Sequence, residues 1–138
     1  MGMRHPLLLA LTLLVTIGAC GETIGGGGTT TTMAAGHLVS GYAHAGPTCP
    51  VETNPPDPAC ADRPVANAVI LVLDPSGTQV AEARTAADGT FSVLLPPGRY
   101  TLVPQPVEGL MGTASQQEVM VGGGPVGGID LSYDTGIR

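Results

Sequence analysis

The stretch from Thr85 to Tyr100 constrains the fold of this chain more than any other segment. Its sequence is TAADGTFSVLLPPGRY. The Asp88–Gly89 pair favours a tight turn, because glycine adopts positive φ without a steric cost. A period of two follows the turn and places Phe91, Val93 and Leu95 on one face of a strand. Pro96–Gly98 ends that strand, so the stretch predicts a strand held between two turns.

The rest of the chain is also rich in strand and turn signals. Its 138 residues include 21 Gly and 13 Pro, which interrupt helices, and many Val and Thr, which favour strands. We therefore expect an all-β fold with seven strands, in which Asp74–Gly77 makes the turn of a hairpin. The expected strands span about 37–44, 67–73, 78–85, 90–95, 99–104, 115–121 and 126–133.

The N-terminal segment has the pattern of an export signal. Arg4 precedes an apolar run of 11 residues, Leu7–Ile17, which is too short to cross about 30 Å of hydrocarbon and fits a signal peptide. Ile17–Gly18–Ala19–Cys20 resembles the bacterial lipobox, in which an aliphatic residue and two small residues precede a cysteine. The resemblance implies cleavage before Cys20 and a lipid on its sulfur. The alternative is an ordinary secretory signal with a chance cysteine.

These patterns divide the chain into three parts. Residues 1–19 are the expected lipoprotein signal peptide, and residues 20–35 are the lipidated cysteine and a Gly- and Thr-rich tether. The tether has no periodic apolar face, which is typical of a flexible linker. Residues 36–138 are the expected folded domain.

Two further cysteines, Cys49 and Cys60, lie in a proline-rich segment that spans residues 45–64. With Cys20 taken by lipid, they are the two thiols left in an exported, oxidising setting. We expect a Cys49–Cys60 disulfide, which would staple a small domain that has no Trp. A metal pair or a reactive thiol is the alternative, although no His pair or activating base stands at a suitable spacing.

Two segments are candidates for an interaction surface. The expected strand 67–73 is apolar on both faces, so its second face needs a cover or a partner. The loop 104–114 carries a Leu-Met pair at its tip. We expect this loop to fold back on the end of the sandwich, and an exposed contact site is the alternative. The candidate surface residues are Val69, Leu71, Leu73, Leu110 and Met111.

Residue patterns that hold metals or catalyse reactions are scarce. A regular strand would point His37 and His44 to opposite faces, unless a bulge at Gly41 reverses one of them. Two carboxylate pairs are expected to be solvated, with calcium binding as the alternative. These pairs are Asp57 with Asp62, and Asp130 with Asp134. We expect no catalytic residue, no metal site and no cofactor.

Three segments together resemble the carboxypeptidase regulatory-like domain. They are residues 64–72 (PVANAVILV), 85–91 (TAADGTF) and 95–101 (LPPGRYT). The resemblance covers about residues 37–132 and is dense only in 64–103. It implies an antiparallel, immunoglobulin-like or prealbumin-like β-sandwich, a type often grouped with carbohydrate-binding-like folds. Ala86 departs from the pattern, because an acidic residue often follows the Thr there, and the Cys49–Cys60 loop is an insertion.

Charge and residue types narrow the function. The chain has five Arg, no Lys and 11 acidic residues, so a nucleic-acid backbone would be repelled. We expect a lipoprotein of a bacterial cell membrane that faces the extracytoplasmic side and acts as a non-catalytic interaction or structural module. Its expected partners are the membrane, through the lipid, and an envelope protein or polysaccharide. A carbohydrate-binding module, testable at Tyr42, and a small hydrolase or metal-dependent enzyme are the alternatives.

Overall fold

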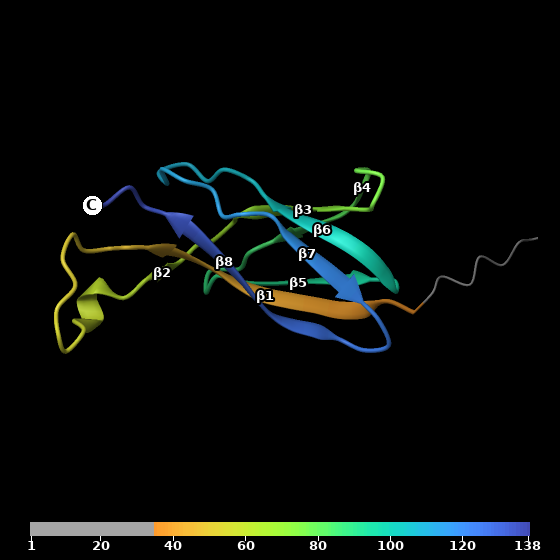
Figure 1. Cartoon of the computed structure of the whole chain (residues 1–138), viewed down its shortest axis with the longest axis horizontal. Coiled ribbons are helices and arrows are strands. Elements are labelled where there is room, and N and C mark those ends of the chain that lie inside the picture. The colour runs from red at the N-terminus through yellow and green to blue at the C-terminus, as the bar shows by residue number, and fades with distance from the viewer. Residues whose placement is uncertain (1–34) are drawn as a thin grey trace, which may run out of the picture. The chain divides into compact units, whose positions relative to one another are not determined.

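The computed structural model describes residues 35–138, which form a sandwich of two β-sheets (Figure 1). The expected signal peptide, Cys20 and all but the last residue of the tether lie outside the described residues. The elements are β1 (His37–Gly46), the 3-10 helix η1 (Pro58–Cys60), β2 (Arg63–Pro64), β3 (Val69–Leu73), β4 (Gln79–Arg84), β5 (Thr90–Leu95), β6 (Gly98–Pro104), β7 (Gln117–Val121) and β8 (Val126–Asp134). Within this part of the chain, no helix has the length and apolar character that a membrane crossing needs.

Sheet A is built around β1. Strand β5 pairs antiparallel with the first part of β1, from His37 opposite Leu95 to Tyr42 opposite Thr90, and β2 pairs antiparallel with its last part. Strand β8 pairs with β1 in parallel. We expected an antiparallel sandwich, and this pair of strands departs from that expectation. The pair is parallel because β8 reaches β1 from the far end of the sequence rather than through a hairpin.

Sheet B contains the other four strands in the order β4-β3-β6-β7, and all of its pairs are antiparallel. The expected hairpin joins β3 to β4. Its turn is closed by the Gly77 amide, which donates to the Asp74 carbonyl at 2.9 Å, and Gly77 has a φ of +83°. The all-β sandwich predicted from the sequence is thus confirmed.

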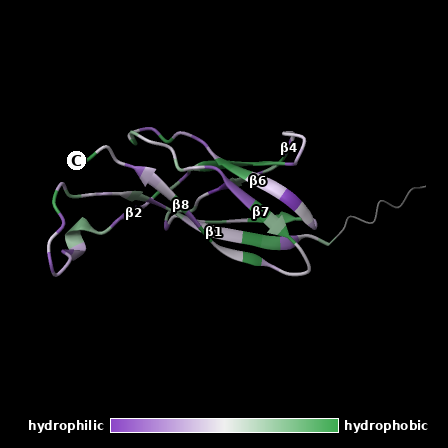
Figure 2. Cartoon of the chain, in the orientation of Figure 1, coloured by the Kyte–Doolittle hydropathy of each residue, from purple (hydrophilic) through white to green (hydrophobic). Residues whose placement is uncertain are grey.

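The core lies between the two sheets and is made almost entirely of apolar side chains. Figure 2 shows hydrophobic segments in β1, β7 and β8 that are interrupted by neutral or hydrophilic ones, as expected for strands with one face in a core. The largest fully buried side chains are Tyr133, Ile70, Leu95, Leu102, Leu131, Val39, Val72 and Val121. Phe91 and Tyr100 are also buried, as the alternation in residues 85–100 predicts.

The segment from Thr85 to Thr90 carries the chain from sheet B to sheet A. Its turn contains Gly89, with a φ of +81°, whose amide donates to the Ala86 carbonyl at 2.9 Å. The Asp88 carboxylate accepts hydrogen bonds from the Thr90 hydroxyl and amide, and these bonds lower the pKa of Asp88. The predicted tight turn is confirmed.

Thr85 is the buried polar residue of the core, and its hydroxyl is fully used. It donates to the Val65 carbonyl at 2.6 Å and accepts from the Ala68 amide at 2.8 Å. These bonds tie the end of β4 to the segment that leads into β3. They satisfy backbone groups that a loop would otherwise leave unpaired in the interior.

The bulge that we considered at Gly41 lies on another strand. The β1–β5 register is regular through Gly41, whereas the β1–β8 register shifts between Val39 and Gly41, where two steps of β1 face three steps of β8. The extra residue is therefore in the Gly127–Gly128 part of β8, and Gly128 has a φ of +75°. The histidines of β1 keep the opposite faces that a regular strand gives them.

The start of β3 and the presence of β2 differ from the sequence-based expectation for local reasons. Strand β3 begins at Val69 rather than at residue 67, because Asn67 has a φ of +59° and turns the chain. The short strand β2 was not expected, because Pro64 cannot donate to a ladder and Arg63–Pro64 pairs only with His44 and Ala45.

Candidate functional site

The outer face of sheet A carries an aromatic pair at its centre. Tyr42 and His44 are two positions apart on β1, so both point to the outer face of the sheet. Their rings are stacked, with centroids 5.7 Å apart and planes 12° from parallel. Tyr42 remains 37% exposed, so part of its side chain is open to a ligand.

Two carboxylates from distant parts of the chain hold His44 in place. Its Nδ1 lies 2.6 Å from Asp62 Oδ2, and its Nε2 lies 3.0 Å from Asp130 Oδ1. The Nδ1–Asp62 contact is a hydrogen bond, and the Nε2–Asp130 contact lies within ion-pair distance. The two contacts fix the ring plane of His44 and thereby the plane against which Tyr42 stacks.

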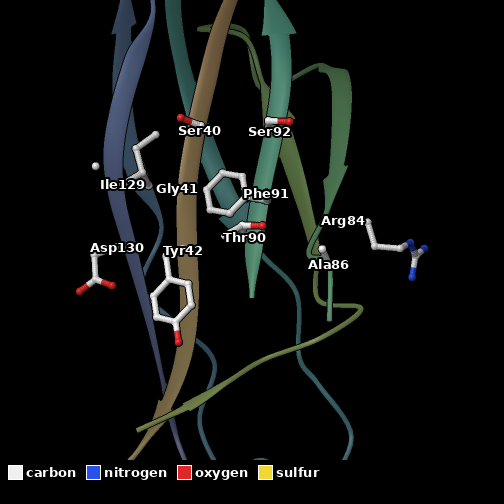
Figure 3. A pocket seen from close by; sticks show the side chains of 11 residues that line it. Ser40, Gly41, Tyr42, Arg84, Ala86, Thr90, Phe91, Ser92, Ile129 and Asp130 are labelled. Carbon is white, nitrogen blue, oxygen red and sulfur yellow. The ribbon is translucent and has the colours of Figure 1, made fainter. Parts of the chain in front are cut away.

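A shallow hollow of about 660 Å³ lies beside this pair and crosses from β8 over β1 to β5. Figure 3 shows Tyr42 and Ser40 on β1, Thr90 and Ser92 on β5, and Asp130 on β8 around it. Arg84 belongs to the same lining but extends away from the others at the far side of β5. The hollow therefore combines one aromatic face with hydroxyl groups, a carboxylate and a guanidinium.

The floor of the hollow is set by Gly41. A Cβ at this position would lie 2.3 Å from the Ile129 carbonyl oxygen and 2.6 Å from Phe91 Cζ. Figure 3 shows the Phe91 ring lying toward Gly41 between β5 and β1. The absence of a side chain here lets β8, β1 and β5 approach closely under the polar groups of the outer face.

Among the residues that the structure describes, no hydroxyl of this site contacts a base that could activate it. A hydroxyl nucleophile needs a base within hydrogen-bond reach. In residues 35–138 both ring nitrogens of His44 face carboxylates, and the Thr90 hydroxyl donates to Asp88. No hydrogen bond joins a Ser or Thr hydroxyl to a histidine in this part of the chain.

The carboxylate pairs that we considered for calcium are separated by the fold. Asp62 and Asp130 both contact His44, whereas Asp57 caps η1 by accepting from the Ala59 amide at 2.9 Å. Asp134 pairs with Arg138. Over the described range, no group of three or more His, Cys, Asp or Glu side chains is placed to hold a metal ion.

The expected disulfide is present. Cys49 and Cys60 are joined, with their Cα atoms 5.2 Å apart, and they close the loop between β1 and β2. The Thr48 hydroxyl also donates to the Ala61 carbonyl at 3.2 Å, so the stem of this loop is held twice. The loop ends at Asp62, and its closure helps to position that carboxylate beside His44.

The two predicted interaction surfaces lie apart from this hollow. The side chains of Val69, Leu71 and Leu73 are half-buried on the outer face of sheet B, at the centre of that sheet. Leu110 packs against the core and Met111 is 80% exposed on the loop between β6 and β7. None of these five residues lines the hollow beside Tyr42, and their role in an interaction stays a prediction.

Part of the Tyr42 site could be predicted from the sequence. The spacing of Tyr42 and His44 in an expected strand places them on one face, although we considered the histidine only with His37. The contact with Asp130 had no local signal, because it depends on the parallel pairing of β8 with β1. Asp62 reaches His44 because the disulfide loop returns to β1 at β2.

Comparison with known proteins identifies the type of domain. The model of the carboxypeptidase regulatory-like domain family matches residues 57–132. No curated protein matches the chain. Three solved structures with a similar fold are a minor pilin of Streptococcus agalactiae (GBS52), the major pilin subunit of Bacillus cereus (BcpA) and the TIE protein of Bacillus anthracis.

The likeness to these structures concerns the fold alone. The TM-scores are 0.53 for both pilins and 0.51 for the TIE protein, at 11%, 18% and 14% identity. The matches cover 72%, 70% and 71% of this chain but 44%, 28% and 17% of the respective neighbours. The chain thus corresponds to one module of these longer proteins.

Proposed function

The chain belongs to the carboxypeptidase regulatory-like domain family, and on this premise we propose that it is a non-catalytic interaction module. The proposed recognition surface is the outer face of sheet A around Tyr42. The protein is held by a lipid on Cys20 at the extracytoplasmic side of a bacterial cell membrane and presents this face to an envelope component. The solved structures with a similar β-sandwich include pilins, and this supports an interaction or structural module rather than a catalytic one.

The stacked Tyr42–His44 pair is the observation that carries the proposal. A solvent-facing Tyr with a fixed ring plane costs little conformational entropy on binding. The hydroxyls of Ser40 and Ser92 and the carboxylate of Asp130 stand around it and supply directional hydrogen bonds. An aromatic anchor ringed by a few polar groups is the usual composition of a ligand site.

The anchor is proposed from the sequence of residues 17–20. The lipid places the module at a membrane surface, and an acyl chain contributes about 0.8 kcal/mol for each buried methylene. Mass spectrometry of the mature protein should find an N-terminus at acylated Cys20, and a Cys20→Ser variant should leave the membrane fraction. A mature chain that begins at another residue would contradict the anchor but would leave the recognition surface untouched.

Capture from detergent-solubilised membranes of the native cells tests the recognition surface. The tagged full chain should retain a reproducible protein or glycan component that Tyr42→Ala loses. Met120→Ala is the matched control, because Met120 is 60% exposed on β7 of sheet B. Equal recovery with Tyr42→Ala and with wild type would place recognition elsewhere and would contradict the proposal.

A carbohydrate is the second candidate ligand, and the exposed ring of Tyr42 favours it. The apolar face of a sugar ring stacks on an aromatic side chain while its hydroxyls bond to neighbouring polar groups. A glycan array should therefore give binding that Tyr42→Ala abolishes and Tyr42→Phe retains, since Phe keeps the platform. An array without signal for the wild-type protein would eliminate the carbohydrate and leave a protein partner.

A further inference from the structure

A second hollow lies at the end of the sandwich where β1 leaves sheet A. Its volume is about 480 Å³, and it lies between β2, the loop after β6 and the C-terminal tail. Strand β1 has ten residues, so this end is about 30 Å from the point where the chain enters the sheet. In Figure 1 this is the end that carries β2 and the C-terminus, opposite the start of β1.

The lining of this hollow is mostly apolar and includes one cation. The apolar residues include Ala45, Val65, Val107, Leu110 and Ile137, and the cation is Arg63. Leu110 is one of the surface residues expected from the sequence. Leu110 lines this hollow and does not line the hollow on the outer face of sheet A.

The walls of the hollow are fixed to one another by backbone hydrogen bonds. The Val65 amide donates to the Ala43 carbonyl at 2.9 Å, which holds the chain after β2 against β1. The Met111 amide donates to the Asp134 carbonyl at 2.9 Å, which holds the loop after β6 against the end of β8. The tail is held by the Thr135 amide, which donates to the Gly46 carbonyl at 3.3 Å. A site with walls fixed in this way loses little entropy when a ligand binds.

Arg63 is available to a ligand. Four arginines lie in residues 35–138, and two of them pair with carboxylates, Arg84 with Glu82 at 3.7 Å and Arg138 with Asp134 at 2.7 Å. Within this range neither Arg63 nor Arg99 makes an ion pair. A guanidinium presents its donors in a fork that matches a carboxylate, so Arg63 can hold one beside the apolar lining.

The other polar groups of the hollow indicate which further groups the ligand carries. The Thr48 hydroxyl already donates to Ala61, so it offers a ligand only its lone pairs and can accept from an N–H group. Glu108 lies in the same lining and repels a second negative charge. These features favour a ligand that combines one carboxylate, an apolar group and an amide N–H.

We propose that this hollow binds the free C-terminus of a peptide whose last residue is apolar. The terminal carboxylate pairs with Arg63, the last side chain lies against Val107 and Leu110, and the peptide N–H groups meet acceptors such as Thr48. A fatty acid would satisfy the first two contacts but has no N–H to donate. This site is separate from the Tyr42 face and does not depend on the function proposed for it.

Fluorescence anisotropy with the full chain in detergent tests the proposal. The probe is the pentapeptide Gly-Ala-Val-Leu-Val with a fluorescein at its N-terminus, offered as the free acid and as the C-terminal amide. The free acid should bind saturably, and amidation should weaken binding at least tenfold. Absence of saturable binding by the free acid, or equal binding of the amide, would overturn the proposal.

Matched variants locate the contact. Arg63→Gln should weaken binding of the free acid at least tenfold. Arg99→Gln removes the other arginine of residues 35–138 that makes no ion pair, and it should change binding less than twofold. Leu110→Glu places a negative charge in the apolar lining and should also weaken binding, with unchanged circular dichroism as the check on folding. An unchanged affinity in Arg63→Gln, or displacement of the peptide by decanoate as effectively as by unlabelled free acid, would contradict a peptide C-terminus at this site.

Discussion

The ring of Phe91 covers Gly41 across the β1–β5 ladder, where the two residues pair directly. The sole Phe of the chain and a glycine without space for a Cβ thus form one structural unit at the centre of sheet A. The Ile129 carbonyl on β8 closes the same position from the other side. The packing of these three strands supports the polar face on which Tyr42 lies.

Gly41→Ala should destabilise the domain. The added methyl would meet a backbone carbonyl and the Phe91 ring, and overpacking of this kind costs about 1–3 kcal/mol. Urea denaturation should show a lower midpoint than wild type. Gly122→Ala is the control, because a Cβ there has no neighbour within 4 Å. Equal midpoints for the two variants would show that β8 and Phe91 can move aside.

Thr85→Val should also lower stability, for a different reason. The substitution keeps the side-chain shape but leaves the buried Val65 carbonyl and Ala68 amide without their hydroxyl partner, at a cost of about 1–3 kcal/mol. Thr101→Val is the control, because Thr101 lies on β6 and its hydroxyl makes no side-chain hydrogen bond in the described part of the chain. A neutral Thr85→Val would mean that water or a shifted backbone replaces the hydroxyl.

Removal of the disulfide should weaken folding without abolishing the sandwich. The bond joins residues 11 positions apart. Opening a loop of that size costs about 3 kcal/mol, mainly through the unfolded chain. The Cys49→Ser/Cys60→Ser variant should unfold at a lower urea concentration than oxidised wild type and at the same concentration as reduced wild type. An unchanged midpoint after reduction would show that the loop is held without the bond.

Asp134 should give the C-terminal end of β8 an acid-sensitive contact. Hydrogen bonds from Arg138 and the Gly136 amide lower the pKa of Asp134 to about 2. Because its pKa in the folded protein is below the unfolded value of about 3.9, the contact stabilises the tail above pH 4 and is lost as the pH falls toward 2.

An NMR titration of the carboxyl carbon of Asp134 measures this pKa directly. Arg138→Gln is the matched variant, because it removes the largest cause of the shift and should raise the pKa toward its ordinary value. Titration of Asp134 near pH 4 in the wild-type protein would show that Arg138 does not hold it in solution.

The sequence was most informative where a local pattern decides the structure. The strand from Thr90 to Leu95 and the turn at Gly89 follow from alternation and from one glycine at positive φ. The Cys49–Cys60 bond followed from counting thiols. By contrast, the parallel pairing of β8 with β1 joins the two ends of the domain, and no local pattern encodes it.

In the candidate site, too, the local features could be predicted from the sequence and the contacts between distant segments could not. Tyr42 and His44 share a face because the side chains of a strand alternate, and this much can be derived from their spacing. The carboxylates that hold His44 come from 18 residues downstream, at Asp62, and from Asp130 on β8. The interaction surface expected at Val69, Leu71 and Leu73 was inferred from hydrophobicity alone. In the structure these side chains are half-buried on the outer face of sheet B.

The most direct test of the recognition surface is photo-crosslinking in native cells. A benzophenone amino acid replaces Tyr42 in one full-length variant and Met120, on sheet B, in another. The proposal predicts a discrete adduct with an envelope component at position 42 and none at position 120. An adduct at position 120 alone, or no adduct at position 42 when the protein is present at its normal level, would contradict recognition through the outer face of sheet A.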